Sequence, residues 1–383
     1  MRSSTTAVRI SSWSSRTSAA SPSATVLLNE SAARGRATIV EKGQTALYVH
    51  VDDGVVLAER GTGLADEQVQ GMSEALEAVG FDVPDRQRDG DLARIVGHEP
   101  EHSPARLRLP ADRGALLQDS LRHLVSLASV DIDTLRSLVG VWIWAALLRR
   151  DLLSIPGVVF RFMEQFEGQV VRWWKTARRE AACMATAGAA FYTDLGAPLA
   201  PVIFATDAMG AGEVDAGGYG IVAKDVEEPL ARACFTLGRR PGYSVTKLSG
   251  EFTGLRRAQQ PILRRVSFSR MPKRLLDAPA DDWKPVAWGR WLFSDHITLG
   301  ETRSVVRLCR GLAQCASAHR YKVMSLQDNG ATAGACAKGW SPAPALNFLL
   351  RQRTASLVAA EVSAMLPWVQ TKVMPADGLS RLL

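Results

Sequence analysis

Four acidic residues in the last third of the chain stand at the ends of apolar runs. Asp207, Asp328 and Asp377 each follow a strand-like run, and Glu301 lies in a helix-like run. One fold could gather all four as hard oxygen ligands, which suit divalent magnesium. Two Mg²⁺ ions held by shared carboxylates activate a water and stabilise the leaving oxygen of a phosphodiester. The pattern therefore predicts a catalytic two-Mg²⁺ site.

Glu301 also fits a purely structural interpretation. Thr298 stands three residues before it, and this spacing is typical of a capping box at the start of a helix. In a capping box the carboxylate faces its own helix terminus, whereas a metal ligand would face the sheet. The sequence leaves both interpretations open.

The runs around these acids predict an α/β domain over residues 200–383, because strand-like and helix-like periodicities alternate there. We expect strands that end at Asp207 and that cover residues 218–222, 283–293, 321–326 and 366–373. Helices are expected over residues 298–318 and 329–337 and after the prolines at 342 and 344. These elements would place the four acids at strand ends and helix starts.

Residues 239–274 are the most basic segment, with ten Lys or Arg residues against one acid, Glu251. Such a block can be plain solvated surface. Its position between two predicted metal ligands favours phosphate contacts, whose strength falls steeply with added salt. The candidate nucleic-acid-binding residues are Arg239, Arg240, Lys247, Arg256, Arg257, Arg264 and Arg265.

A second pair of carboxylates, Asp52 and Asp53, lies near the N-terminus between apolar runs at 47–51 and 55–58. Asp-Gly between such runs predicts a β-hairpin. The pair is either a surface turn or a set of carboxylates held at the edge of a buried sheet. Helical patterns follow over residues 63–79, 115–127 and 132–149.

Residues 153–199 form a link in which Trp173 and Trp174 lie among basic residues. Aromatic rings beside arginines can stack on nucleic-acid bases. The spacing favours instead the packed and solvated faces of an amphipathic helix.

The 383-residue chain has a net charge of +7 and is 46% hydrophobic. These values predict two or three globular domains and favour a polyanionic partner. The five cysteines show no metal-binding spacing and are typical of free thiols in a reducing compartment. The longest apolar run, 138–148, is shorter than the roughly 20 residues that cross a bilayer, so we expect no membrane partner and an intracellular, cytoplasmic or nuclear location.

Residues 1–43 are rich in serine and arginine and are predicted to be disordered, because they can bury little apolar surface. The first 24 residues also have the composition of an organellar transit peptide. The disordered tail is the favoured interpretation.

The last third is similar to the ribonuclease H domain of DIRS-like retrotransposons. The similarity is carried, in order, by TDAMGAGEVDAGGYG, HITLGETRSV, DNGATAGACAKGWSPAPALNFLLRQ and LPWVQTKVMPADGLSR. It implies a mixed five-stranded sheet with flanking helices, with a basic insertion over about 239–290. It also implies that two Mg²⁺ ions on Asp207, Glu301, Asp328 and Asp377 cleave the RNA strand of an RNA–DNA hybrid. Gly300, Trp340 and Gln370 depart from the family pattern.

The segment VHVDDGVV resembles the palm hairpin of reverse transcriptases, with Asp52 and Asp53 at the magnesium-binding pair. The resemblance implies a partial palm and helical thumb over 44–152 and a connection over 153–199. Such a polymerase needs a third aspartate from an upstream strand, and the residues before the hairpin supply none.

These resemblances together predict an α/β (α+β) chain from a retroelement polyprotein. In it, a ribonuclease H-type endonuclease follows a polymerase remnant that cannot polymerise alone. The alternative is a catalytically silent nucleic-acid-binding remnant, or a scaffold that pairs with a separate polymerase chain.

Overall fold

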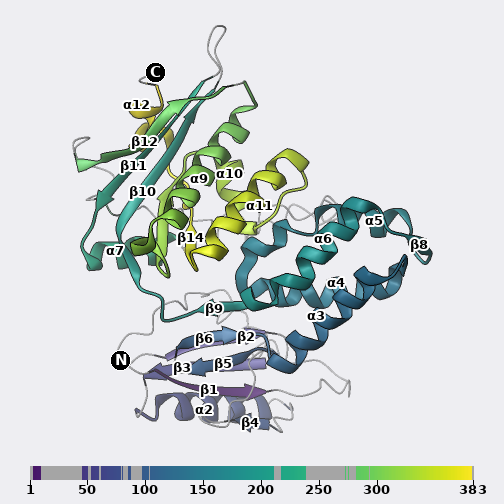
Figure 1. The fold of residues 1–383 in the computed structure, drawn as a ribbon. Coiled ribbons are helices and arrows are strands. Elements are labelled where there is room, and N and C mark those ends of the chain that lie inside the picture. Colours follow the sequence, from purple (N-terminus) through teal and green to yellow (C-terminus); the bar gives the residue numbers. More distant parts are fainter. Residues whose placement is uncertain are drawn as a thin grey trace, which may run out of the picture. The chain divides into compact units, whose positions relative to one another are not determined.

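The computed structural model describes residues 3–9, 45–50, 53–59, 62–78, 80, 85–87, 97–102, 104–210, 217–238, 272, 275, 282–292 and 294–381. They belong to two compact units, Met1–Pro110 and Ala111–Leu383, whose elements are labelled in Figure 1. The boundary differs from the predicted one at residue 152. The helices assigned to a thumb belong to the same unit as the C-terminal sheet.

The first unit holds a four-stranded sheet in the order β2-β3-β1-β4. Its strands are β1 (Ser3–Arg9), β2 (Thr45–His50), β3 (Asp53–Glu59) and β4 (Asp85–Gln87), and a separate antiparallel pair is formed by β5 (Glu99–His102) and β6 (Ala105–Arg108). Helix α2 (Leu64–Ala78) packs Ala65, Val69 and Leu76 against Val56. Gly80, with φ of 92°, follows the end of this helix. The predicted hairpin and helix are confirmed.

Strand β1 departs from the disorder predicted for residues 1–43. It pairs antiparallel with β3, from Ser3 opposite Glu59 to Arg9 opposite Asp53. Thr5, Thr6 and Val8 are β-branched and suit a strand once a neighbour supplies hydrogen bonds. That neighbour lies far along the chain, so the local composition does not reveal the pairing.

The second unit begins with a helical part. Its elements are α3 (Ala111–Ser126), β7 (Ser129–Asp131), α4 (Ile132–Ala146), η1 (Leu147–Ser154), α5 (Gly157–Gln165), β8 (Val170–Arg172), α6 (Lys175–Thr186), η2 (Ala187–Ala190) and β9 (Tyr192–Asp194). Trp142 is fully buried at its centre and donates a hydrogen bond to the Met184 carbonyl at 3.0 Å. The helices expected at 115–127 and 132–149 are confirmed by α3 and by α4 with η1.

The two tryptophans of the link are packing residues. They lie between β8 and α6, so this stretch is a strand followed by a helix rather than one helix. The rings of Trp173 and Trp174 lie 5.5 and 5.3 Å from the ring of Phe162, centroid to centroid. Both rings are half-buried and pack against the ring of Phe162, although the amphipathic helix expected here does not form.

A mixed five-stranded sheet follows, in the order β12-β11-β10-β13-β14. The strands are β10 (Leu199–Met209), β11 (Gly218–Asp225), β12 (Lys284–Arg290), β13 (Lys322–Leu326) and β14 (Ser363–Met365). Strand β11 pairs antiparallel with both β10 and β12, whereas β13 pairs in parallel with both β10 and β14. This confirms the predicted fold class, a mixed five-stranded sheet with flanking helices.

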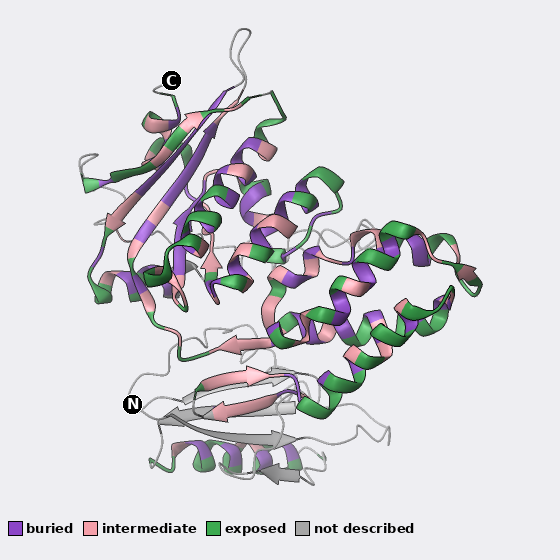
Figure 2. Ribbon diagram, in the orientation of Figure 1, coloured by how far each residue is buried: buried purple, intermediate pink, exposed green. Residues whose placement is uncertain are grey.

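Helices cover both faces of this sheet. The helical elements are α7 (Glu228–Gly238), α9 (Ile297–Gln314), η6 (Ala316–Ala318), α10 (Gly330–Lys338), α11 (Pro344–Ala359), η7 (Thr371–Val373) and α12 (Asp377–Ser380). Residues of α9 and α11, such as Val305 and Leu350, form one core with Ile221, and residues of α7, such as Cys234, form another with Ile203. The buried central strands between these layers are visible in Figure 2.

Two predicted boundaries in this unit are wrong. Residues 284–290 form the edge strand β12, so they belong to the sheet and not to the basic insertion. The last strand is Ser363–Met365 rather than 366–373, because Pro367 lacks the N–H that a ladder needs. After the proline, only Trp368 pairs with Gln327 in an isolated parallel bridge.

Among the described residues, no helix is both long and apolar enough to span a membrane. All five cysteines are free thiols.

Candidate metal centre

Asp207 is placed by the long strand β10. Side chains alternate along a strand, so Asp207 shares a sheet face with Ile203 and Ala205, whose side chains are fully buried. Its own side chain is 4% exposed, and its Oδ2 accepts a hydrogen bond from the Ser380 hydroxyl. The apolar strand therefore carries a carboxylate into the interior, where a side chain from α12 meets it.

Gly220 allows helix α12 to reach Asp207. It lies opposite Asp207 on β11, and a Cβ at this position would come within 2.8 Å of the Ser380 nitrogen and 3.0 Å of the Ala376 carbonyl oxygen. Only glycine permits so close an approach of two backbones. The helix start therefore lies directly on the strand and delivers Asp377 and Ser380 to the site.

Glu301 lies in the second turn of α9 and faces the sheet. The helix is capped by His296, whose Nδ1 accepts from the Thr298 N–H at 3.3 Å. Thr298 is thus not the N-cap, and the capping interpretation of Glu301 is wrong. The Glu301 side chain is 4% exposed, and its Oε2 accepts from Gln327 Nε2 at 2.9 Å.

Gly300 lies where α9 packs against β10. A Cβ there would lie 3.5 Å from the Ala208 Cβ and 3.4 Å from Trp291 Nε1. Both distances are ordinary van der Waals contacts, so an alanine would also fit at this position. The glycine that departs from the family pattern is therefore not required for Glu301 to approach Asp207.

Asp328 is held between the end of β13 and the start of α10. Its carbonyl accepts from Trp368 Nε1 at 2.7 Å, which fixes the backbone on one side. On the other side, Asn329 caps α10 by accepting from the N–H groups of Ala331 and Thr332. The side chain of Asp328 is left to point towards the other acids.

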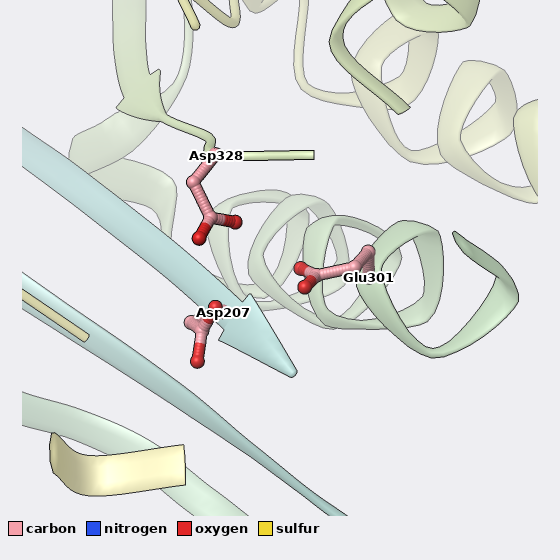
Figure 3. Close-up of side chains that lie close together, drawn as sticks. All are labelled: Asp207, Glu301 and Asp328. Atoms are coloured by element: carbon pink, nitrogen blue, oxygen red, sulfur yellow. The ribbon is translucent and has the colours of Figure 1, made fainter. Parts of the chain in front are cut away.

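Three of the four predicted ligands converge. One oxygen from each of Asp207, Glu301 and Asp328 lies within 4.8 Å of the others. Figure 3 shows these carboxylates facing one another from strand β10, helix α9 and the segment after β13. Asp377 is not part of this group, and its Oδ1 accepts from Arg381 Nε at 3.0 Å and Nη2 at 2.7 Å.

The electrostatics of the group show an excess of negative charge. Burial, followed by the charge of Asp207, raises the pKa of Glu301 to about 8, although the Gln327 amide works in the opposite direction. Burial raises the pKa of Asp207 to about 6, although the hydrogen bond from Ser380 lowers it. The charges of Asp328 and Asp377 add to the rise. No lysine or arginine in the described part of the chain forms an ion pair with any of the three carboxylates.

This donor set fits a hard divalent cation. All three ligands offer carboxylate oxygens, which Mg²⁺, Mn²⁺ and Ca²⁺ prefer. A bound cation would also offset the burial and the repulsion that together raise both pKa values. Asp377 influences Asp207 through its charge and lies beside the group. It is the residue that could extend the ligand set towards a second ion.

The structure says less about the other candidate residues. Asp52 and all seven basic residues between Arg239 and Arg265 lie outside the described residues. Of Asp53, the structure places the backbone, which pairs with His50 in the hairpin. His296 and His319 make structural contacts, because His296 caps α9 and His319 Nε2 lies 3.0 Å from the Ala313 carbonyl.

Sequence reasoning missed the polar residues that surround the acids, chiefly Gln327, Ser380 and Trp368. Gln327 immediately precedes Asp328, and Ser380 lies one turn after Asp377. A polar residue next to a predicted ligand at the end of a buried strand is a usable signal. Its partner, however, depends on tertiary contacts that the sequence does not show.

No family model and no curated protein matches the chain. Among solved structures, the chain is similar to the N-terminal RNase H domain of Rv2228c from Mycobacterium tuberculosis, fused to maltose-binding protein. The identity is 14% and the TM-score 0.26 over 46% of this chain and 88% of that one.

It is also similar to two structures of the foamy viral protease-reverse transcriptase in complex with double-stranded DNA. Both are 10% identical and cover 96% of this chain, with TM-scores of 0.38 and 0.34. The similarity spans 57% of the first viral chain and 68% of the second.

Proposed function

We propose that the chain is a metal-dependent nuclease of the ribonuclease H type that cleaves the RNA strand of an RNA–DNA hybrid. The observation that carries this proposal is the set of three buried carboxylates, from β10, α9 and the end of β13, within 4.8 Å of one another. Their order along the chain matches the motifs that resemble the ribonuclease H domain of DIRS-like retrotransposons. That group assignment rests on the sequence motifs alone.

The chain's own residues would bind and orient the reacting groups. Asp207, Glu301 and Asp328 would hold the first cation, and Asp377 would complete the ligands of a second. Bound magnesium supplies a Lewis acid for the phosphate oxygens and lowers the pKa of a water. Ser380 holds one oxygen of Asp207, which leaves the other oxygen free for coordination. No side-chain nucleophile is required.

The test is digestion of a labelled RNA–DNA hybrid with Mg²⁺ by the wild type and by Asp328→Asn. We expect the wild type to cut the RNA strand and the variant to lose cleavage, because one ligand oxygen loses its charge. Asp282→Asn is the matched control, since Asp282 is half exposed and pairs with Lys224 away from the cluster. Equal cleavage by wild type and Asp328→Asn would remove the mechanism.

For the first unit we propose a reverse-transcriptase palm remnant that does not polymerise alone. Besides its hairpin partner β2, strand β3 pairs with β1, whose sequence, SSTTAVR, contains no carboxylate. A third magnesium-binding aspartate is therefore absent from that strand. Primer extension that depends on Asp52 and Asp53 would contradict this proposal.

The second candidate is a silent nucleic-acid-binding remnant or a scaffold for a separate polymerase chain. It is favoured by the ion pair that Asp377 makes with Arg381, which occupies the fourth predicted ligand. The same hybrid assay separates the two candidates, because a silent remnant would bind the hybrid and leave its RNA strand intact.

A further inference from the structure

A buried glutamine bridges the acidic cluster from behind. The Gln327 side chain is fully buried, and its Nε2 donates to Glu301 Oε2 at 2.9 Å. Its Oε1 accepts from the hydroxyl of Thr206, also fully buried, at 3.0 Å. The amide is therefore satisfied at both ends, by one neutral and one ionisable partner.

The direction of this bridge is specified. An ionised Glu301 carboxylate can only accept, so the amide nitrogen of Gln327 faces it and the amide oxygen accepts from the Thr206 hydroxyl. Thr206 precedes Asp207 on β10, and Gln327 precedes Asp328 after β13. Neighbouring side chains on a strand point to opposite faces, so Thr206 reaches towards α9 while Asp207 faces α12.

The backbone of Gln327 is fixed as well. Its N–H donates to the Pro367 carbonyl at 3.1 Å, and its carbonyl accepts from the Val369 N–H at 2.9 Å. The side chain therefore starts from a held backbone and ends in two hydrogen bonds. Little further ordering is needed to keep Glu301 in place.

We propose that Gln327 is a positioning residue, which holds one oxygen of Glu301 and so orients the carboxylate for binding a divalent cation. This inference rests on the metal site of the proposed function. Residues that hold metal ligands through hydrogen bonds are typically worth about 10- to 100-fold in metal affinity. Thr206 acts one step further out, because its hydroxyl holds the amide oxygen of Gln327 in place.

The test is calorimetric titration of the full chain with Mn²⁺, without nucleic acid, beside the melting temperature of each metal-free protein. We expect Gln327→Met to bind Mn²⁺ about 10- to 100-fold more weakly than the wild type. Thr206→Val should lower Mn²⁺ affinity less, about several-fold. Thr206→Ser should keep the wild-type affinity, because serine retains the hydroxyl. Ser325→Ala is the matched control, since Ser325 is buried on β13 and its Oγ has no hydrogen-bond partner among the residues that the structure describes.

The outcomes separate this inference from the proposed function. A wild type that binds no Mn²⁺ would overturn the metal site itself, and the role of Gln327 with it. Wild-type affinity in a folded Gln327→Met protein, with a lowered melting temperature, would overturn the positioning role and leave the metal site intact. If Gln327→Met does not fold, Thr206→Val decides, because unchanged affinity in that variant also overturns the inference.

Discussion

Two groups of buried charges in the second unit are arranged in opposite ways. The Arg353 side chain is 1% exposed and forms an ion pair with Asp151, and its Nη2 donates to the Ala364 carbonyl at 3.3 Å. Asp207 and Glu301 are buried to a similar degree but face another carboxylate, Asp328. The first group is neutral as folded, whereas the second carries uncompensated negative charge.

The pKa values record this difference. Burial disfavours the charged form of Arg353, but the attraction of Asp151 outweighs it and keeps the pKa of Arg353 above its ordinary value. At Glu301, burial and the charge of Asp207 act together and raise the pKa to about 8. A buried pair joins elements, here η1 to α11. A buried cluster of one sign costs stability unless a cation binds it, which is why such clusters occur at functional sites.

Breaking the paired group should have the largest effect on stability. Arg353→Met leaves Asp151 without its partner, so we expect the free energy of unfolding to fall by about 3–5 kcal/mol. Urea denaturation followed by tryptophan fluorescence measures it, because nine of the ten tryptophans lie in Ala111–Leu383.

The control for this variant is Arg122→Met, which removes an exposed pair with Asp119. Exposed pairs contribute about 0–1 kcal/mol. If Arg353→Met costs no more than Arg122→Met, the buried pair does not hold η1 to α11.

Neutralising one member of the acidic cluster should raise the stability of the metal-free protein rather than lower it. Glu301→Gln removes a buried charge, so at pH 8 the metal-free variant should be more stable than the wild type, on the order of 2 kcal/mol. The gain should shrink towards pH 4.5, where the wild-type carboxyl group is already protonated. Urea denaturation at both pH values with EDTA present checks this, and a variant less stable at pH 8 would contradict it.

The fold around the cluster was largely predictable, because apolar runs and turn residues are local signals. They give β10, β11, α9, β13 and α10 in their observed order. Strand β1 and the end of β14 were not predictable in this way, since both depend on hydrogen-bond partners far along the chain.

The site was predictable to a lesser degree. The approach of Asp207, Glu301 and Asp328 follows from their positions at strand ends and on a helix. The interpretation of Glu301 depended on a tertiary contact, the hydrogen bond from Gln327. The pairing of Asp377 with Arg381 had a local signal that was overlooked, because residues four apart on a helix are neighbours.

A divalent cation should compensate the negative charge of the acidic cluster, as Arg353 compensates that of Asp151. The stabilising effect should be larger at high pH. The raised pKa values of Asp207, about 6, and Glu301, about 8, mean that the folded metal-free chain holds more protons than the unfolded chain between about pH 4 and pH 8. Stability therefore falls as the pH rises through this range. Mg²⁺ must displace these protons, so its stabilising effect should grow with pH.

At ten times its dissociation constant at pH 8, Mg²⁺ should stabilise the chain by about 1.4 kcal/mol. That corresponds to a rise of about 3–5 °C in melting temperature. The same concentration at pH 5 should give a smaller rise, and Asp207→Asn should give none at either pH. Differential scanning fluorimetry measures the shifts, and an equal rise at both pH values would contradict the coupling.

The smallest effect on stability is expected from Gly220→Ala, which tests how the fourth carboxylate is held. The added Cβ would come within 2.8 Å of the Ser380 nitrogen, so α12 must move away from β11. Because α12 is a four-residue helix whose Asp377 and Arg381 pair at the surface, we expect it to shift at a cost of about 1 kcal/mol. The shift should nevertheless lower hybrid cleavage strongly, since Asp377 and Ser380 both move away from Asp207.

Gly334→Ala is the matched control, because a Cβ there meets nothing within 4 Å and alanine suits the interior of α10. Full cleavage by Gly220→Ala would mean that Asp207, Glu301 and Asp328 suffice, and that Asp377 belongs with the paired charges rather than with the cluster.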